Sequence, residues 1–240
     1  MSKLDYDLIT SAYIHINPIN ERELDLRGKK IQKIENLTLT KDQNDAIDLT
    51  DNDILKLANF PIMVNLKTIL CANNRITKIE PTISQYLPNL KVLILNNNVI
   101  QELGDLDPLT GFEFLETLSL IDNIVCSKDY YRLYVIHRCP KLRVLDFKKV
   151  KESERKEALE LFSGEEGTKL VNSLSAQGMN GNTFDPDTDL KLGLKKVSSI
   201  YKAPSKEHQD KIREAIKNAK SLQEIQRLEQ SLSSGIIPEA

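Results

Sequence analysis

The chain has 240 residues, of which 40% are hydrophobic and 28% are charged, with a formal net charge of −2 and a pI near 6.0. This composition is typical of a soluble protein with one or two domains. No apolar run approaches the roughly 18 residues that cross a bilayer, and the first residues lack a signal-peptide core. We therefore expect an intracellular protein with no membrane partner.

Cys71, Cys126 and Cys139 share no CxxC or metal-ligand spacing. We expect core or incidental thiols in preference to a disulfide or a zinc site. This expectation argues against the disulfide-stapled caps of extracellular repeat proteins.

Residues 1–23 carry alternating apolar side chains and are predicted to form an N-terminal cap. From residue 24 onward a short motif then recurs five times, and its sixth residues are 23, 22, 24 and 25 positions apart. The copies are LDLRGKKI at 24–31, IDLTDNDI at 47–54, ILCANNRI at 69–76, LILNNNVI at 93–100 and LSLIDNIV at 118–125. This pattern and spacing are typical of leucine-rich repeats.

In each copy two apolar side chains point into the core from a short strand, and an asparagine satisfies backbone groups where the chain turns. The predicted asparagine ladder is Asn52, Asn74, Asn98 and Asn123. Lys29 takes that position in the first copy, where a capping repeat is expected to be atypical. The fold class is therefore α/β, a right-handed leucine-rich-repeat solenoid with parallel strands on its concave face. The repeats are placed near 24–46, 47–68, 69–92, 93–117 and 118–141.

The solenoid is predicted to end in a C-terminal cap over 129–162, which closes a repeat domain over 1–162. Apolar spacing predicts a short helix around Tyr131–Ile136, a last strand around Leu142–Phe147, and a helix over 151–162. Residues 163–205 turn to Gly, Ser, Asn, Asp and Thr, which predicts a partly disordered linker. Residues 206–240 regain helical periodicity and are predicted to form an amphipathic helical tail. We favour a tail that docks on a partner over a solvated spacer.

The concave face is the candidate partner-binding site. Its strand positions are Asp25, Arg27, Asp48, Thr50, Leu70, Ala72, Val92, Ile94, Asn96, Ser119 and Ile121. Leu70, Ile94 and Ile121, with Val92 nearby, predict an apolar patch of a kind that monomers seldom leave exposed. Asp25, Asp48 and Asp51 are expected to add acidic contacts at one end. The alternatives to a protein partner are that tight curvature hides the patch, or that the tail covers it.

Nucleic-acid binding by this face alone is disfavoured, because affinity for phosphates comes largely from Lys and Arg and the face holds one Arg against several Asp. The densest basic cluster is Lys148, Lys149 and Lys151, which is either a solvated edge or a set of RNA-backbone contacts.

Catalysis is also disfavoured. The three histidines are dispersed, and no catalytic, cofactor or metal motif is present.

Several runs outside the repeat consensus carry a more specific resemblance. They are RELDLRGKKIQKIENL (22–37), DAIDLTDNDI (45–54), NNRI (73–76), LPNLKVLILNNN (87–98), ELGDLDPL (102–109), YYRLYVIHRCPKLRVLDFKKVKESER (130–155) and SLQEIQRLEQSLSSGIIP (221–238). These runs closely resemble the family of A′ proteins of the U2 small nuclear ribonucleoprotein, with only 163–205 weakly matched. A generic leucine-rich repeat would not reproduce all of them together.

The resemblance implies a nuclear, non-enzymatic spliceosomal subunit without cofactors. In that family the concave face holds a helix of the RNA-recognition-motif protein B″, and the pair binds a stem-loop near the 3′ end of U2 snRNA. The C-terminal helix is a candidate contact for other U2 or spliceosomal proteins. The alternative class is a generic leucine-rich-repeat adaptor not associated with RNA, such as the acidic nuclear phosphoprotein or dynein-associated families. The former typically carries a long acidic tail, which this sequence does not show.

Overall fold

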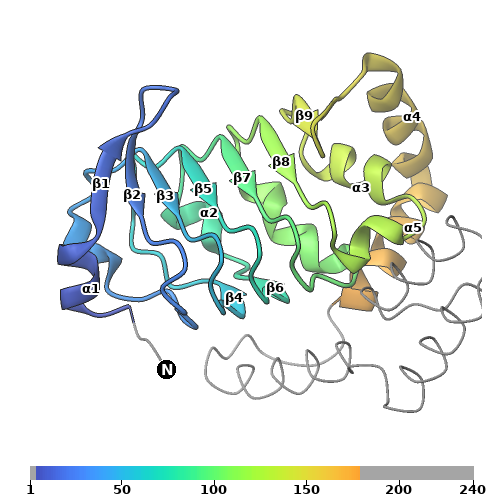
Figure 1. The fold of residues 1–240 in the computed structure, drawn as a ribbon. Coiled ribbons are helices and arrows are strands. Elements are labelled where there is room, and N and C mark those ends of the chain that lie inside the picture. The colour runs from blue at the N-terminus through green and yellow to red at the C-terminus, as the bar shows by residue number, and fades with distance from the viewer. Residues whose placement is uncertain (1–3, 179–240) are drawn as a thin grey trace, which may run out of the picture. The chain divides into compact units, whose positions relative to one another are not determined.

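The computed structural model of the protein describes residues 4–178, which fall within one compact unit of the chain. Within these residues the strands form an eight-stranded sheet in the order β1-β2-β3-β5-β7-β8-β9-β10 (Figure 1). The strands of this sheet are β1 (Tyr13–Ile16), β2 (Arg22–Asp25), β3 (Ala46–Asp48), β5 (Thr68–Leu70), β7 (Val92–Ile94), β8 (Thr117–Ser119), β9 (Val144–Leu145) and β10 (Lys148–Lys149). The six strands from β2 to β9 run parallel, as the repeats predict, and an antiparallel strand closes each edge.

The connections between strands complete each coil of the solenoid behind the sheet (Figure 1). They contain a small parallel sheet and short helices. These elements are β4 (Lys56–Leu57), β6 (Lys78–Ile79), α2 (Ile83–Tyr86), and the 3₁₀ helices η1 (Leu37–Thr40), η2 (Leu103–Gly111) and η3 (Ile124–Ser127). No helix within residues 4–178 is long and apolar enough to cross a membrane.

The repeat motif sets the strand register. Leu24, Ile47, Ile69, Leu93 and Leu118 occupy matching positions on neighbouring strands, and each is at most 1% exposed. Stacking is what buries them, because a single coil would leave its apolar face wet. Cys71 replaces leucine at a fully buried second anchor, and no disulfide involves it, in agreement with a core thiol.

The predicted asparagine ladder is present, and each member ties its own coil to the preceding one. Asn98 accepts a hydrogen bond from the Ile76 amide at 2.9 Å, and its side-chain amide donates to the carbonyls of Cys71 and Leu95 at 2.9 and 3.0 Å. Asn52, Asn74 and Asn123 repeat this pattern. Lys29 lies in the first coil, which has no preceding repeat to bind, and its side chain is exposed.

A second ladder runs beside the first at the carboxyl ends of the strands. Asp51, Asn73, Asn97 and Asp122 are left-handed, with φ between 52° and 61°. Asn and Asp tolerate this conformation better than other side chains. Asn73 donates to the Asp51 carboxylate at 2.7 Å, and Asn97 donates to Asn73 at 3.0 Å. Asp51 is thus an exposed turn residue at the sheet edge, and its expected acidic contact with a partner stays a prediction.

Both predicted caps form. The N-terminal cap consists of α1 (Tyr6–Ser11) and β1, and Asp5 caps the helix by accepting from the Leu8 amide at 2.9 Å. The C-terminal cap contains α3 (Tyr131–Arg138), the β9–β10 hairpin and α4 (Glu152–Phe162). Arg132 clamps these three parts together, since it donates to the Leu145 and Lys149 carbonyls and forms an ion pair with Glu154.

The prediction of a linker from residue 163 is wrong for its first part, because α5 covers Gly164–Gly178. Val171 is 7% exposed, with Leu170 and Leu174 packed beside it, so a helical apolar stripe docks on the cap. Ser175 lies 2.9 Å from the Tyr134 hydroxyl and accepts from Arg138 at 2.8 Å. The Gly- and Ser-rich composition concealed this stripe. The rest of the predicted linker, 179–205, and the predicted tail, 206–240, lie outside the described residues.

Candidate functional site

The face of the sheet turned away from the core, called the open face below, is the predicted concave surface. Side chains on a strand alternate between faces, so each strand contributes the residues that flank its buried anchors. In the view of Figure 1 the open face is toward the reader and α2 lies behind the sheet. The structure brings all eleven predicted positions onto this face: Asp25, Arg27, Asp48, Thr50, Leu70, Ala72, Val92, Ile94, Asn96, Ser119 and Ile121.

The centre of the open face is apolar. Leu70 and Ile94 are register partners on adjacent strands, and Val92 precedes Ile94 by two residues on the same face. These three side chains and Ile121 are half-buried, because neighbouring rows lie only about 4.8 Å apart and shield one another. An apolar strip formed by Leu70 on β5, by Val92 and Ile94 on β7, and by Ile121 just after β8 stays partly accessible.

Two buried polar atoms border this strip without a hydrogen-bond partner among residues 4–178. They are the hydroxyl of Ser119, which is fully buried and pairs in register with Ile94, and the side-chain oxygen of Asn96. Buried polar groups in folded proteins nearly always have partners. Both atoms are closed to solvent in the free chain, so a polar group of a binding partner would satisfy them only after the two side chains rotate toward it.

The N-terminal end of the open face is acidic. Glu23, Asp25 and Asp48 lie side by side on β2 and β3, and Arg27 is 2.8 Å from Asp25 and 3.4 Å from Asp48. The hydrogen bond from Arg27 holds the pKa of Asp25 below its usual value, whereas burial raises the pKa of Asp48. Three carboxylates against one guanidinium leave this corner negative, which favours a partner with cationic side chains.

Asp48 is expected to reduce folding stability at neutral pH. Its pKa is raised in the folded chain, so the folded state binds the proton more tightly than the unfolded state, and ionisation disfavours folding. Asp48→Asn keeps an acceptor for the Thr50 amide, which donates to Asp48 at 2.9 Å. We expect the variant to unfold at a higher temperature than wild type at pH 7. The gain should shrink as the pH falls toward 3.8, the ordinary value for Asp.

Thermal unfolding of both proteins between pH 3 and pH 7 measures this difference. An Asp48→Asn variant that is less stable than wild type at pH 7 would contradict the raised pKa of Asp48 in the folded chain. Confirmation would show that an acidic group is kept on the open face although folding alone does not need it, as is usual at binding sites.

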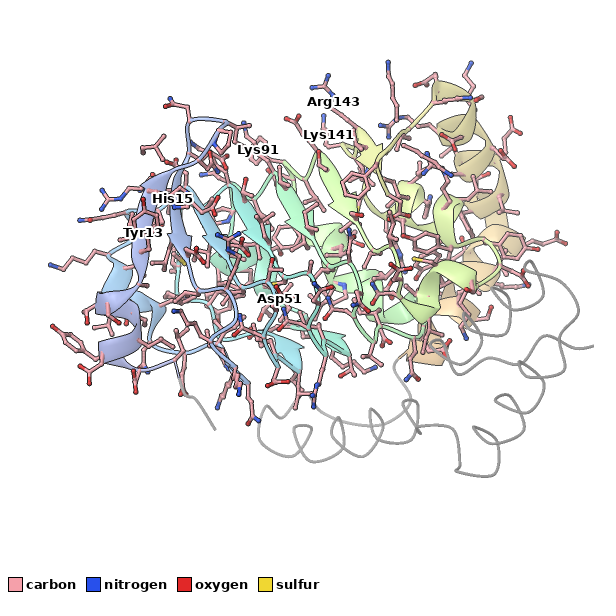
Figure 2. The ribbon with its side chains drawn as sticks, in the orientation of Figure 1. Tyr13, His15, Asp51, Lys91, Lys141 and Arg143 are labelled. Carbon is pink, nitrogen blue, oxygen red and sulfur yellow. The ribbon has the colours of Figure 1, made fainter. Side chains whose placement is uncertain are left out.

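The open face extends beyond the predicted positions. Tyr13 and His15 on β1 pair in register with Asp25 and Glu23, and their rings stack with centroids 5.1 Å apart (Figure 2). Sequence reasoning missed these two because β1 joins through a hairpin whose register the repeat does not specify. Of the residues that precede the first anchor of each strand, sequence reasoning found only Val92, although strict alternation would have found the others. These are Glu23, Ala46, Thr68, Thr117 and Val144.

The predicted basic cluster lies at the C-terminal edge of the sheet. Lys148 and Lys149 form β10, Lys151 precedes α4, and all three are exposed. Lys149 pairs in register with Val144 and so shares the open face. Figure 2 shows three further exposed cations, Lys91, Lys141 and Arg143, at the edge of the sheet opposite Asp51. The cations therefore border the open face, whose centre carries none.

The described residues contain no group of three or more His, Cys, Asp or Glu side chains placed to hold a metal ion. His137 packs against Phe162 with ring centroids 5.1 Å apart, and burial lowers its pKa. Burial also raises the pKa of Cys139 to about 12, which leaves the thiol protonated and unreactive at neutral pH. Both groups contribute to packing, and the open face remains the candidate site.

Comparisons with known proteins agree with this geometry. Residues 1–175 match the leucine-rich repeat family. The chain is 47% identical over 238 residues to the human U2 small nuclear ribonucleoprotein A′, covering 99% of this chain and 90% of the human protein. It is 45% identical over 239 residues to the Schizosaccharomyces pombe protein of the same name, covering 98% and 99% of the two chains.

A solved structure supports the same assignment. The crystal structure of the Drosophila melanogaster SNF/U2A′ complex contains a chain with 48% identity and a TM-score of 0.69, covering 72% of this chain and 99% of that chain. The named relatives are ribonucleoprotein subunits, a class of binding proteins and not enzymes. The chain therefore belongs to the U2 small nuclear ribonucleoprotein A′ family of leucine-rich-repeat proteins.

Proposed function

We propose that this protein is a nuclear, non-enzymatic subunit of the U2 small nuclear ribonucleoprotein that acts in pre-mRNA splicing by holding an RNA-recognition-motif protein of the B″ type on its open face. The observation that carries the proposal is the open face itself, an apolar strip with two unpartnered polar atoms and an acidic end. The crystallised Drosophila relative in complex with SNF supports a partner of this class.

The open face indicates what the partner must present. A helix laid across the strands would place apolar side chains on Leu70 and Ile94 and a polar side chain near Ser119. Its cationic residues would lie toward Asp25 and Asp48, where the local charge is negative. Charge complementarity of this kind fixes the orientation of a partner and raises its association rate more than its affinity.

RNA recognition would then belong mainly to the pair. Arg27, the one cation on the predicted face, is already engaged by Asp25 and Asp48, so the face offers little to a phosphate backbone. Proteins read RNA loops by stacking unpaired bases on aromatic side chains, which an RNA-recognition motif supplies. This chain would orient that motif on a 3′ stem-loop of U2 snRNA and add backbone contacts from Lys148, Lys149 and Lys151.

The test is reconstitution of the complex from the full chain, a B″-type protein and the U2 stem-loop. We expect the two proteins to bind each other without RNA, and the pair to bind the stem-loop more tightly than the B″-type protein alone. Two proteins that associate only through RNA would contradict a direct contact. A partner bound without any effect on RNA would support a generic leucine-rich-repeat adaptor.

Residues 206–240 are proposed to contact other U2 or spliceosomal proteins.

The lysine contacts can be tested through salt dependence. The logarithm of the binding constant falls linearly with the logarithm of the salt concentration, and each lost phosphate contact makes this negative slope shallower by roughly 0.7–0.9. Replacing Lys148, Lys149 and Lys151 with Ala is expected to make the slope for stem-loop binding shallower by about 2. The affinity for the protein partner should stay unchanged. Lys29, Lys30 and Lys41 are exposed lysines in the first repeat, and their triple Ala variant is the charge-matched control. Equal slopes for the two triple variants would exclude the predicted RNA contacts.

A further inference from the structure

The turn of the β9–β10 hairpin displays an aromatic side chain that the fold does not use. Phe147 is 64% exposed, and no other aromatic ring among residues 4–178 contacts it. Its backbone has φ +58°, and Asp146 before it has φ +53°. Two successive left-handed residues form the hairpin turn that favours Asp-Gly or Asn-Gly. A bulky residue in the second position is unusual, and the hairpin would form more easily with glycine there.

The turn that carries Phe147 is held firmly. The Asp146 carboxylate accepts from the Leu120 amide at 2.8 Å and from the Tyr131 hydroxyl at 2.9 Å, and the Asp146 amide donates to Leu118 at 3.0 Å. Arg132 fixes both strands of the hairpin from behind. The ring is therefore presented to solvent on a fixed support, which lowers the entropic cost of binding a ligand.

The neighbours of Phe147 indicate the class of ligand. Lys148 and Lys149 follow it directly, both are exposed, and neither forms an ion pair within the described part of the chain. Lysine is depleted in protein–protein interfaces. An exposed ring flanked by cations is the arrangement with which proteins hold single-stranded nucleic acid, because the ring stacks on a base while the cations bind phosphates.

We propose that Phe147 is a base-stacking residue, which contacts an unpaired base of the bound RNA while Lys148 and Lys149 hold the flanking phosphates. The inference rests on the proposed function, since the partner on the open face would bring the RNA to this edge of the sheet. The lysines alone would bind the phosphate backbone of any RNA. A stacked base would add a contact that requires an unpaired base at this position of the RNA.

The test compares Phe147→Gly and Phe147→Trp in the reconstituted complex with the U2 stem-loop. Glycine is expected to keep or raise the unfolding temperature, to leave partner binding without RNA unchanged, and to weaken RNA binding about 5- to 100-fold. The Phe147→Trp variant is expected to bind the RNA about as tightly as the wild-type protein, because its ring can stack on a base. The salt slope should stay at the wild-type value, because a stacked base releases no counterions. Leu159→Ala on α4 is the matched control, because Leu159 is also 64% exposed.

Ultraviolet cross-linking with 4-thiouridine in the RNA locates the contact independently, and the cross-linked peptide is expected to contain Phe147. Wild-type RNA affinity in Phe147→Gly would overturn this inference and leave the proposed function standing. Weaker partner binding without RNA would overturn it by making the ring a protein contact. Failure of the wild-type complex to bind the stem-loop would overturn the proposed function as well.

Discussion

Replacing Ile94 with Asp is expected to weaken binding of the B″-type partner by roughly 100- to 1000-fold, or about 3–4 kcal/mol. Ile94 lies at the centre of the open face, between its register partners Leu70 and Ser119. A partner that covers this position would bury the new carboxylate without a counter-charge. Truncation or disruption at the desolvated centre of an interface has the largest effect on affinity. Leu70→Asp should behave in the same way.

The free protein should tolerate this change, because Ile94 is half-buried and water can reach a carboxylate there. Titration calorimetry measures the affinity, and circular dichroism confirms that the variant is folded. Ile62→Asp is the control, since Ile62 is 67% exposed and lies in the connection between β4 and β5, away from the open face. A folded Ile94→Asp protein with wild-type affinity would show that the partner binds elsewhere.

Asn98→Ala is expected to destabilise the fold by about 3 kcal/mol, because the buried Ile76 amide loses its acceptor and the carbonyls of Cys71 and Leu95 each lose one of their two side-chain donors. Asn98 is 2% exposed, so water cannot replace these bonds without opening the core. For a chain of this size the loss corresponds to a fall of roughly 10 °C in the unfolding temperature. Differential scanning calorimetry measures both quantities.

Asn89→Ala provides the comparison for this effect. Asn89 donates one hydrogen bond to the Val64 carbonyl at 2.8 Å in an exposed position, and its loss should change stability by less than about 1 kcal/mol. Similar stability losses in the two variants would mean that the ladder contributes no more than an ordinary surface hydrogen bond. Since Asn52, Asn74 and Asn123 make the same kind of bonds, the result applies to each coil that carries a ladder asparagine.

The sequence predicted those parts of the fold that depend on local pattern. The spacing of apolar anchors specifies which residues enter the core, and the asparagine after them marks each turn, so the parallel sheet and the ladder followed directly. Alternation along a strand then assigned the open face, including Leu70 and Ile94. Every one of these inferences needs only neighbouring residues and the repeat period.

The remaining features depend on contacts between distant segments. Tyr13 and His15 reach the open face only through the register of β1 on β2. Helix α5 is stable because Val171 packs on the cap and Ser175 meets Tyr134, 41 residues earlier in the chain. The apolar pattern over 142–147 predicts a strand through Phe147, whereas Asp146 and Phe147 form a turn, because the left-handed backbone has no local signal in Asp-Phe.

Photocrosslinking from the open face tests the central claim most directly. A benzoylphenylalanine in place of Asn96, beside the apolar strip, should cross-link to a helix of the RNA-recognition-motif partner, whereas the same group in place of Ile62 should give no cross-link. Mass spectrometry of the linked peptides identifies the contact. Cross-linking of the partner from position 62 and not from position 96 would contradict the assignment of the open face as the binding site.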